Sequence, residues 1–262
     1  MKYIEASHNQ ELTEVVLFPI GDLHIGSPHF DKKELIDNLK IVDSHGNKAR
    51  IIIMGDLAET ALKDSVGAGV YEQQESAQHQ MMTAKNLLFP YKDIIDGIVT
   101  GNHEERVYKN SGFDLMLYFA QIMGLEDKYL RYQGIINYTI NQRNFNVSVW
   151  HGSGGGGTPG GAMNRLQKQA ETVLADLYLM GHVHRRQAHT KTLYIPDNRN
   201  GKIDLMKQVF VVTGSALTHE GSYAEMAGFA PTEKGFPKIT LSVERKTLDD
   251  IKFRKKIIKV EI

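Results

Sequence analysis

Short apolar segments alternate with polar turns and amphipathic segments through the first half of the chain. Continuous apolar runs predict buried strands, and apolar residues three and four positions apart predict helices. The strands are expected at residues 15–20, 51–54 and 98–99, and the helices at residues 31–42, 76–88 and 113–123. A repeated order of strand, polar turn and helix is typical of an α/β architecture, in which a sheet is buried between helices.

The second half has a different pattern, with more strands than helices. Two runs at residues 135–140 and 145–150, joined by a short polar stretch, predict a β-hairpin. One helix is expected at residues 164–174, and further strands at residues 177–180, 192–195, 208–213 and 238–243, with a basic, strand-like tail at 253–262. The glycine-rich segment 152–161 is expected to be a loop. No repeat or clear linker is present, so we expect one domain over residues 1–262.

Five of the apolar runs are followed directly by aspartate, histidine or asparagine. These residues are Asp22 with His24, Asp56, Asn102 with His103, His151, and His182 with His184. Ligands of α/β sheets bind at the carboxyl ends of strands, where these groups would meet. One such group alone is more often an ordinary turn or surface residue, but five at one sheet edge indicate a site.

The chemistry of these side chains indicates a metal centre. Asp22 and Asp56 would repel each other at one site unless a cation lay between them. Imidazole, carboxylate and amide oxygen together suit Zn, Mn, Fe, Ni or Co, with Mg possible. The chain has no cysteine, which excludes thiolate ligands.

The five groups occur in a recognisable order. The sequence resembles the calcineurin-like metallophosphoesterases in Gly21-Asp22-Leu23-His24, Gly55-Asp56, Gly101-Asn102-His103-Glu104, His151-Gly152 and Gly181-His182-Val183-His184. The resemblance implies an α/β fold of two packed mixed β-sheets flanked by helices, a four-layer sandwich. It also implies two divalent metal ions, for which Mn²⁺ is the expected metal in vitro and Zn²⁺, Fe, Ni²⁺, Co²⁺ or Mg²⁺ are alternatives.

The resemblance also implies a role for each residue. The first metal would be held by Asp22, His24 and His184, and the second by Asn102, His151 and His182, with Asp56 between them. His103 would bind no metal and would act on the leaving-group oxygen. Arg106 is a candidate phosphate clamp, because a guanidinium forks onto phosphate oxygens; a surface arginine is an equal alternative.

The expected activity is metal-dependent hydrolysis of phosphate esters, with a metal-bridging hydroxide as nucleophile. We expect a phosphodiesterase or phosphatase acting on small or nucleotide substrates. One alternative is a nuclease of DNA or RNA of the Mre11/SbcD type, for which the basic stretch from Lys252 to Lys259 is a partial argument; a solvated strand edge explains that stretch better. Another alternative is a metal-binding scaffold that has lost catalysis.

Composition adds little to this hypothesis. Lysine and arginine number 31 and aspartate and glutamate also 31, so no global charge attracts a polyanion. No apolar run is long enough to span a bilayer, and the first residues lack the apolar segment of a secretory signal. These features, with the absence of cysteine, predict a cytoplasmic protein without membrane contact.

Overall fold

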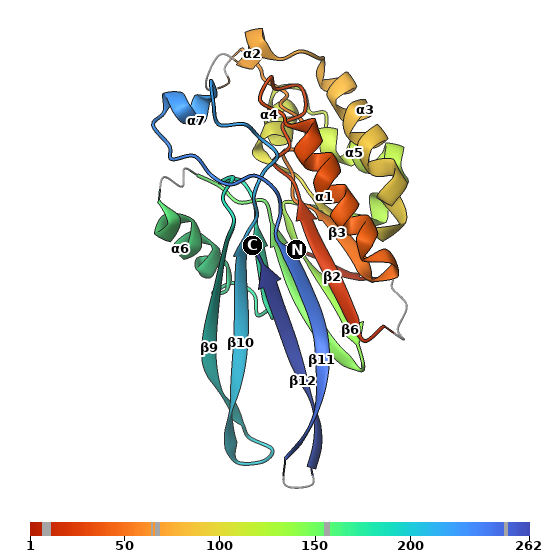
Figure 1. The fold of residues 1–262 in the computed structure, drawn as a ribbon, viewed down its shortest axis with the longest axis vertical. Helices are drawn as coiled ribbons and strands as arrows, with labels where there is room; N and C mark the ends of the chain where they lie inside the picture. The colour runs from red at the N-terminus through yellow and green to blue at the C-terminus, as the bar shows by residue number, and fades with distance from the viewer. Residues whose placement is uncertain (7–11, 64, 66–68, 155–157, 249–250) are drawn as a thin grey trace.

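The computed structural model of the chain describes residues 1–6, 12–63, 65, 69–154, 158–248 and 251–262 (Figure 1). Its strands form two mixed six-stranded sheets, which confirms the predicted fold class. One sheet has the order β1-β6-β7-β8-β10-β9, with β1 Lys2–Glu5, β6 Gln133–Ile140, β7 Arg143–Trp150, β8 Leu177–Met180, β9 Gln187–Asp197 and β10 Lys202–Val212. The other has the order β12-β11-β2-β3-β4-β5, with β2 Glu14–Ile20, β3 Ala49–Ile53, β4 Ile95–Val99, β5 Tyr129–Arg131, β11 Lys238–Leu248 and β12 Ile251–Glu261.

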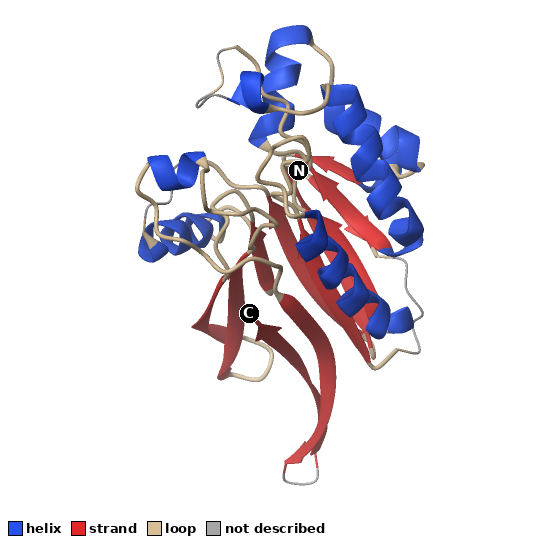
Figure 2. Ribbon diagram, turned by 45° about the horizontal axis from the view of Figure 1, so that its top comes forward, coloured by secondary structure: helices blue, strands red, loops and turns tan. Residues whose placement is uncertain are grey.

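Helices cover the outer faces of both sheets, giving four layers (Figure 2). The helices are α1 Lys32–Ser44, α2 Gly69–Glu72, α3 Ala77–Leu88, α4 Asn102–Ser111, α5 Leu115–Met123, α6 Pro159–Gln169 and α7 Tyr223–Met226, with short 3-10 turns at Gly46–Lys48, Phe89–Ile94 and Glu126–Lys128. One apolar core joins α1, α3 and α5 to the second sheet, another lies between the sheets, and a third joins α6 to the first sheet. No helix among the described residues is both long and apolar enough to cross a membrane.

The arrangement of strands creates the edge at which a site can form. Strands β2, β3 and β4 run parallel, as do β7, β8 and β10 in the other sheet. Their carboxyl ends therefore lie at one edge of each sheet, and these edges meet. The backbone N–H of His182, after β8, donates to the carboxylate of Asp22, after β2, at 3.0 Å.

Two long antiparallel hairpins, β9–β10 and β11–β12, extend away from the helical end of the molecule (Figure 1). A turn at residues 198–201 joins β9 to β10. Strand β12 is the edge strand of its sheet, as expected for the basic tail. The end of β9–β10 lies outside the core, since Tyr194 remains 79% exposed and Ile203 68% exposed.

Several predicted boundaries are wrong. Helix α6 spans Pro159–Gln169 instead of residues 164–174, because Thr158 caps it and Pro159 suits its first position. Residues Pro159 to Gly161 of the predicted glycine loop are therefore helical, while residues 155–157 lie outside the described part. Helix α4 and strands β1 and β5 were not expected, and β9, β10 and β11 are longer than predicted. The extra residues of β9 and β10 are mostly exposed, including the apolar Ile203 and Leu205, so no buried apolar pattern marks them.

Candidate metal centre

All seven predicted metal ligands lie together at the edge where the carboxyl ends of the strands meet. The backbone there is unusual. Asp22, His24, Asp56, His182 and His184 have φ angles of 49°, 49°, 48°, 72° and 52°, in the left-handed region that non-glycine residues rarely adopt. Strained backbone of this kind is typical of functional sites, where tertiary contacts hold side chains in required positions.

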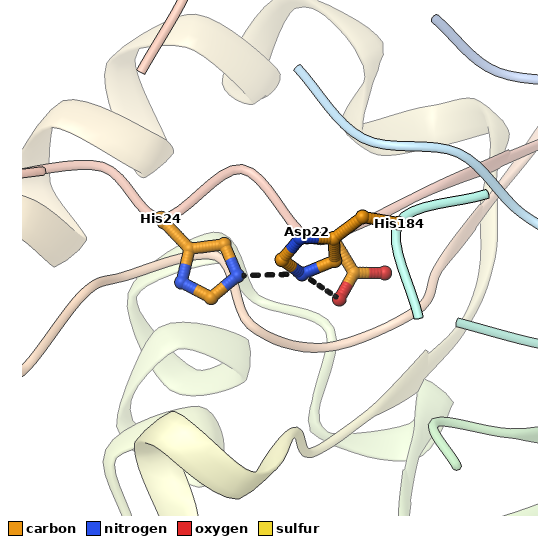
Figure 3. Close-up of side chains that lie close together, drawn as sticks. All are labelled: Asp22, His24 and His184. Carbon is orange, nitrogen blue, oxygen red and sulfur yellow. Dashed lines mark hydrogen bonds and ion pairs between the residues drawn. The ribbon is translucent and has the colours of Figure 1, made fainter. Parts of the chain in front are cut away.

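The first group of ligands consists of Asp22, His24 and His184 (Figure 3). The Nε2 atoms of His24 and His184 are 3.1 Å apart, and His184 Nε2 is 3.3 Å from Asp22 Oδ1. Asp22 and His24 are buried, whereas the side chain of His184 is one-third exposed. The three ligand atoms thus point at one small volume that solvent can reach from the side of His184.

The second group contains Asp56, His151 and His182, whose ligand atoms all lie within 4.8 Å of one another. His151 Nε2 is 3.2 Å from Asp56 Oδ2 and 3.1 Å from Asn102 Oδ1. His151 Nδ1 donates to the carbonyl of Met54 at 2.6 Å, because a carbonyl oxygen can only accept. This hydrogen bond leaves Nε2 as the atom that faces Asp56 and Asn102.

Asp56 lies between the two groups. Its Oδ2 atom is 3.2 Å from His151 Nε2 and 3.9 Å from His24 Nε2, so one carboxylate oxygen is shared by both. With Nδ1 of His151 protonated, the neutral ring, the carboxylate and the amide oxygen all offer lone pairs to the same volume. A proton or a cation between them removes the repulsion, and this donor set fits a divalent metal ion. The predicted ligands therefore fit two metal positions with Asp56 common to both.

Glu59, which the sequence pattern did not indicate, supports two of the predicted site residues. Its Oε2 atom lies 3.0 Å from His24 Nδ1 and 3.7 Å from His103 Nδ1. His103 Nδ1 also donates to the backbone carbonyl of Glu59 at 2.7 Å. Both histidines thereby turn their Nε2 atoms toward Asp56, at 3.9 and 4.0 Å. The sequence pattern does not indicate Glu59, because this residue lies in a loop and does not follow an apolar strand directly.

Glu104, at the start of α4, fixes the backbone around Asp56. Its carboxylate accepts the backbone N–H groups of Asp56, Ala58 and Gly101 at 3.0, 3.1 and 3.0 Å. These three bonds give Glu104 a supporting role, in which it holds the backbone that carries Asp56. Gly101 is required at this point, since an added Cβ would lie 2.0 Å from Asp56 Oδ1.

The charges in the site influence one another strongly. Burial would raise the pKa of Asp56, but the charges of His151 and His103 outweigh burial and hold it well below its usual value. Burial likewise opposes protonation of His151, yet Asp56 and Asp22 raise its pKa to about 10. For His103 burial dominates and lowers the pKa to about 4. In metal-free protein, a proton on His151 therefore occupies the space that a cation would fill.

Arg106 lies on α4, at the rim of the site. Its Nη1 atom donates to the hydroxyl of Ser65, and its charge lowers the pKa values of both Glu59 and His103. The guanidinium is therefore close to His103, as the predicted phosphate clamp requires. Its contact with phosphate remains a prediction.

No family model matches the sequence, and no curated protein matches it. Solved structures that are similar include vacuolar protein sorting 29 from Cryptosporidium parvum, with 14% identity and a TM-score of 0.42 over 95% of this chain and 99% of that chain. Vps29 from Entamoeba histolytica, complexed with Zn²⁺, has 14% identity and a TM-score of 0.42 over 93% of this chain and 99% of that chain. A predicted phosphoesterase from Streptococcus pneumoniae has 12% identity and a TM-score of 0.37 over 95% of this chain and 99% of that chain. At these low similarities, no function follows from the comparisons.

Proposed function

We propose that the protein is a hydrolase of phosphate esters that works with two divalent metal ions. The observation that carries this proposal is the position of Asp56 between two groups of possible ligands. Its Oδ2 atom lies 3.2 Å from His151 Nε2, 3.9 Å from His24 Nε2 and 4.0 Å from His103 Nε2. A site for structural metal needs no such additional imidazole. The ligands come from both sheets, and an apolar core joins the sheets, which supports one catalytic domain.

The bound cations would offset the negative charge of a phosphoryl group and lower the pKa of a water molecule. The protein's own residues complete the site. Asp22, His24 and His184 would hold one cation, His151, His182 and Asn102 the other, and Asp56 both. The positions of His24 and His151 are fixed by hydrogen bonds from their Nδ1 atoms to Glu59 and Met54, so their Nε2 atoms are available to metal.

His103 would act on the leaving group. Its Nδ1 proton is hydrogen-bonded to the carbonyl of Glu59, so Nε2 is the ring atom that can reach a departing oxygen. Burial disfavours a charged ring, and a phosphate group bound beside it would favour one. Proton transfer by a positioned group of this kind typically contributes about 10²- to 10⁴-fold to the rate. Arg106, on the same helix, would bind a phosphoryl oxygen.

The test combines metal analysis with turnover. Purified protein loaded with Mn²⁺, Zn²⁺, Ni²⁺ or Co²⁺ is assayed on p-nitrophenyl phosphate and bis-p-nitrophenyl phosphate, which separates monoesterase from diesterase activity. We expect two metal equivalents per chain and turnover of at least one ester. Asp56→Asn should abolish both, whereas Asp93→Asn, an exposed matched control, should retain both. Two bound metals without turnover of either ester would contradict the proposal and favour a non-catalytic metal-binding protein.

A further inference from the structure

A pocket with a volume of about 450 Å³ is lined by two residues that adjoin the predicted ligand His184. Its lining includes Pro159, Arg185, Arg186, Pro231, Thr232 and Ile262. Arg185 follows the ligand His184 directly, and the Thr232 hydroxyl donates to the His184 carbonyl at 2.8 Å. The volume suits a small-molecule group and exceeds what one phosphate needs. The pocket is therefore placed to receive a part of the substrate beyond the ester that would be hydrolysed.

The two arginines of the pocket differ in their charge balance. Arg186 Nη2 bonds to Glu233 Oε2 at 2.7 Å, so its charge is paired. Arg185 makes no hydrogen bond or ion pair with any residue that the structure describes, and its side chain is only partly exposed. Among the side chains that line the pocket, this leaves one positive charge without an ion pair, on a guanidinium. That group is suited to phosphate, since it donates two parallel hydrogen bonds to phosphate oxygens.

The other walls are consistent with a phosphate joined to a ring. Pro159 is the first residue of α6, and the N-terminal end of a helix favours a negative charge. Pro159 and Pro231 add apolar surfaces, against which a sugar or a base can pack. Glu233 is the one acidic residue in the lining, and it is paired with Arg186.

We propose that this pocket binds a second phosphate group of the substrate through Arg185. The substrate class is then a nucleotide with phosphates on both the 3′ and the 5′ oxygen, one at the metal centre and the other at Arg185. This chemistry is shared by free nucleoside bisphosphates and by a nucleic-acid strand. The inference rests on the proposed function for the ester held by the metals, but the binding of the second phosphate can be measured without hydrolysis.

The experiment measures the affinities of Mn²⁺-loaded protein for thymidine 3′,5′-bisphosphate and thymidine 5′-monophosphate by calorimetry in the cold, with chromatography to verify that both ligands stay intact. The wild type should bind the bisphosphate about 10- to 100-fold more tightly, the usual value of hydrogen bonds to a charged group. Arg185→Gln keeps similar size without charge and should reduce this ratio to about one. Arg199→Gln, which removes the same charge from the exposed turn after β9, should leave the ratio unchanged.

Equal affinities of the wild type for the two ligands, or a preference that survives in Arg185→Gln, would overturn the proposal. An equal loss of affinity for both ligands in Arg185→Gln would also overturn it, because the residue would then support the site in general. Single-stranded oligothymidylate distinguishes the sources. Binding with the same Arg185 dependence would identify a strand, and binding restricted to the free bisphosphate would identify a small molecule.

A kinetic comparison separates this inference from the proposed function. The p-nitrophenyl esters of thymidine 5′-phosphate, with and without a 3′-phosphate, are assayed with Mn²⁺. Hydrolysis of both esters with equal kcat/KM would support the proposed function and overturn the second phosphate site. Absence of hydrolysis, together with an Arg185-dependent preference for the bisphosphate in calorimetry, would overturn the proposed function and leave the pocket established.

Discussion

The Nδ1 atom of His24 lies 3.0 Å from a carboxylate oxygen of Glu59, and this contact determines which nitrogen of the ring faces the metal centre. The interaction with Glu59 helps to raise the pKa of His24 against the opposing effect of burial. The carboxylate therefore stabilises a proton on Nδ1 and directs Nε2 toward His184 and Asp56. A residue outside the predicted motif thus orients one of the motif's ligands.

Glu59→Gln should weaken metal binding without unfolding the protein. The amide retains the shape of the side chain but loses the charge that holds the proton of His24, and loss of such a partner typically reduces metal affinity about 10- to 100-fold. Titration with Mn²⁺ followed by calorimetry measures the change. Glu72→Gln, in exposed helix α2, is the matched control. Unchanged affinity in Glu59→Gln would show that the contact does not orient the ligand.

His103→Ala should retain both metals and lose most of the turnover. His103 lies outside the two groups assigned to metal, although its ligand atom is within 4.8 Å of those of His24 and Glu59, and its Nε2 atom is 4.0 Å from Asp56 Oδ2. We expect kcat to fall about 10²- to 10⁴-fold, the usual contribution of a general acid. Metal content by mass spectrometry and rate on bis-p-nitrophenyl phosphate are measured together, with exposed His79→Ala as control. Wild-type kcat in His103→Ala would remove His103 from the mechanism.

Removal of metal should lower the thermal stability at neutral pH. Each ion that binds only the folded chain stabilises it by about 2.7 kcal/mol when its concentration is one hundred times the Kd. Calorimetric scans with Mn²⁺ and with a chelator should therefore differ in Tm. Asp56→Asn, which removes the shared ligand, should lose most of this difference. A Tm that does not depend on the metal would argue against a folded-state site.

Gly101→Ala should disrupt the second group of ligands. The added Cβ would lie 2.0 Å from Asp56 Oδ1 and 2.3 Å from its backbone nitrogen, so Asp56 would have to move. We expect loss of at least one metal equivalent and a rate reduced more than about 100-fold, as a misplacement near 1 Å can cause. In Gly160→Ala the added Cβ would meet nothing within 4 Å, so this variant should keep its metal content.

The buried carboxyl of Asp96 should make stability depend on pH. It lies between the sheets beside Arg50, and burial raises its pKa to about 6 although Arg50 opposes the shift. Because the folded pKa is above the unfolded value, Asp96 stabilises the protein fully below about pH 4, and the contribution is lost as pH rises through about 6.

Urea unfolding of the wild type and Asp96→Asn with chelator, at pH 4 and at pH 8, measures this contribution. The wild type should lose about 3 kcal/mol relative to the variant between these values, since one pKa unit corresponds to about 1.36 kcal/mol. Exposed Asp93→Asn should show no such difference. A relative gain of wild-type stability at pH 8 would mean that Arg50 dominates over burial.

Much of the fold could be predicted because the strands next to the site are buried on both faces. Such strands have continuous apolar sequences, as at Ile51 to Ile53, and the polar residue after each marks its end. The order of these strands and the resemblance together predicted that these seven side chains lie close to one another, as they do in the structure; their binding of metal remains a prediction. Apolar periodicity was also sufficient for α1 and α3, which each bury one face against the second sheet.

The elements that were missed lack such a burial signal. The outer parts of β9 and β10 are stabilised by pairing with each other and have few buried side chains. Helix α4 buries only Glu104, so its sequence has no apolar face. Glu59 and Arg185 were missed for a related reason. Glu59 contacts histidines distant in sequence, and Arg185 lines a pocket formed by four separate segments, so tertiary structure alone gives each its surroundings.

At five of the predicted ligands, the left-handed backbone lowers the stability of the fold, while the side chain of the same residue serves the proposed activity. Each such residue costs of the order of 1–3 kcal/mol of stability, and glycine would relieve much of this cost. Glycine has no side chain to bind a cation. A glycine at any of these positions would therefore remove the backbone strain and the metal ligand together. If the chain were evolved in the laboratory for heat resistance alone, in metal-free medium, we would expect glycine to accumulate at Asp22, His24, Asp56, His182 and His184. The most heat-resistant descendants would then be those that no longer need metal at all.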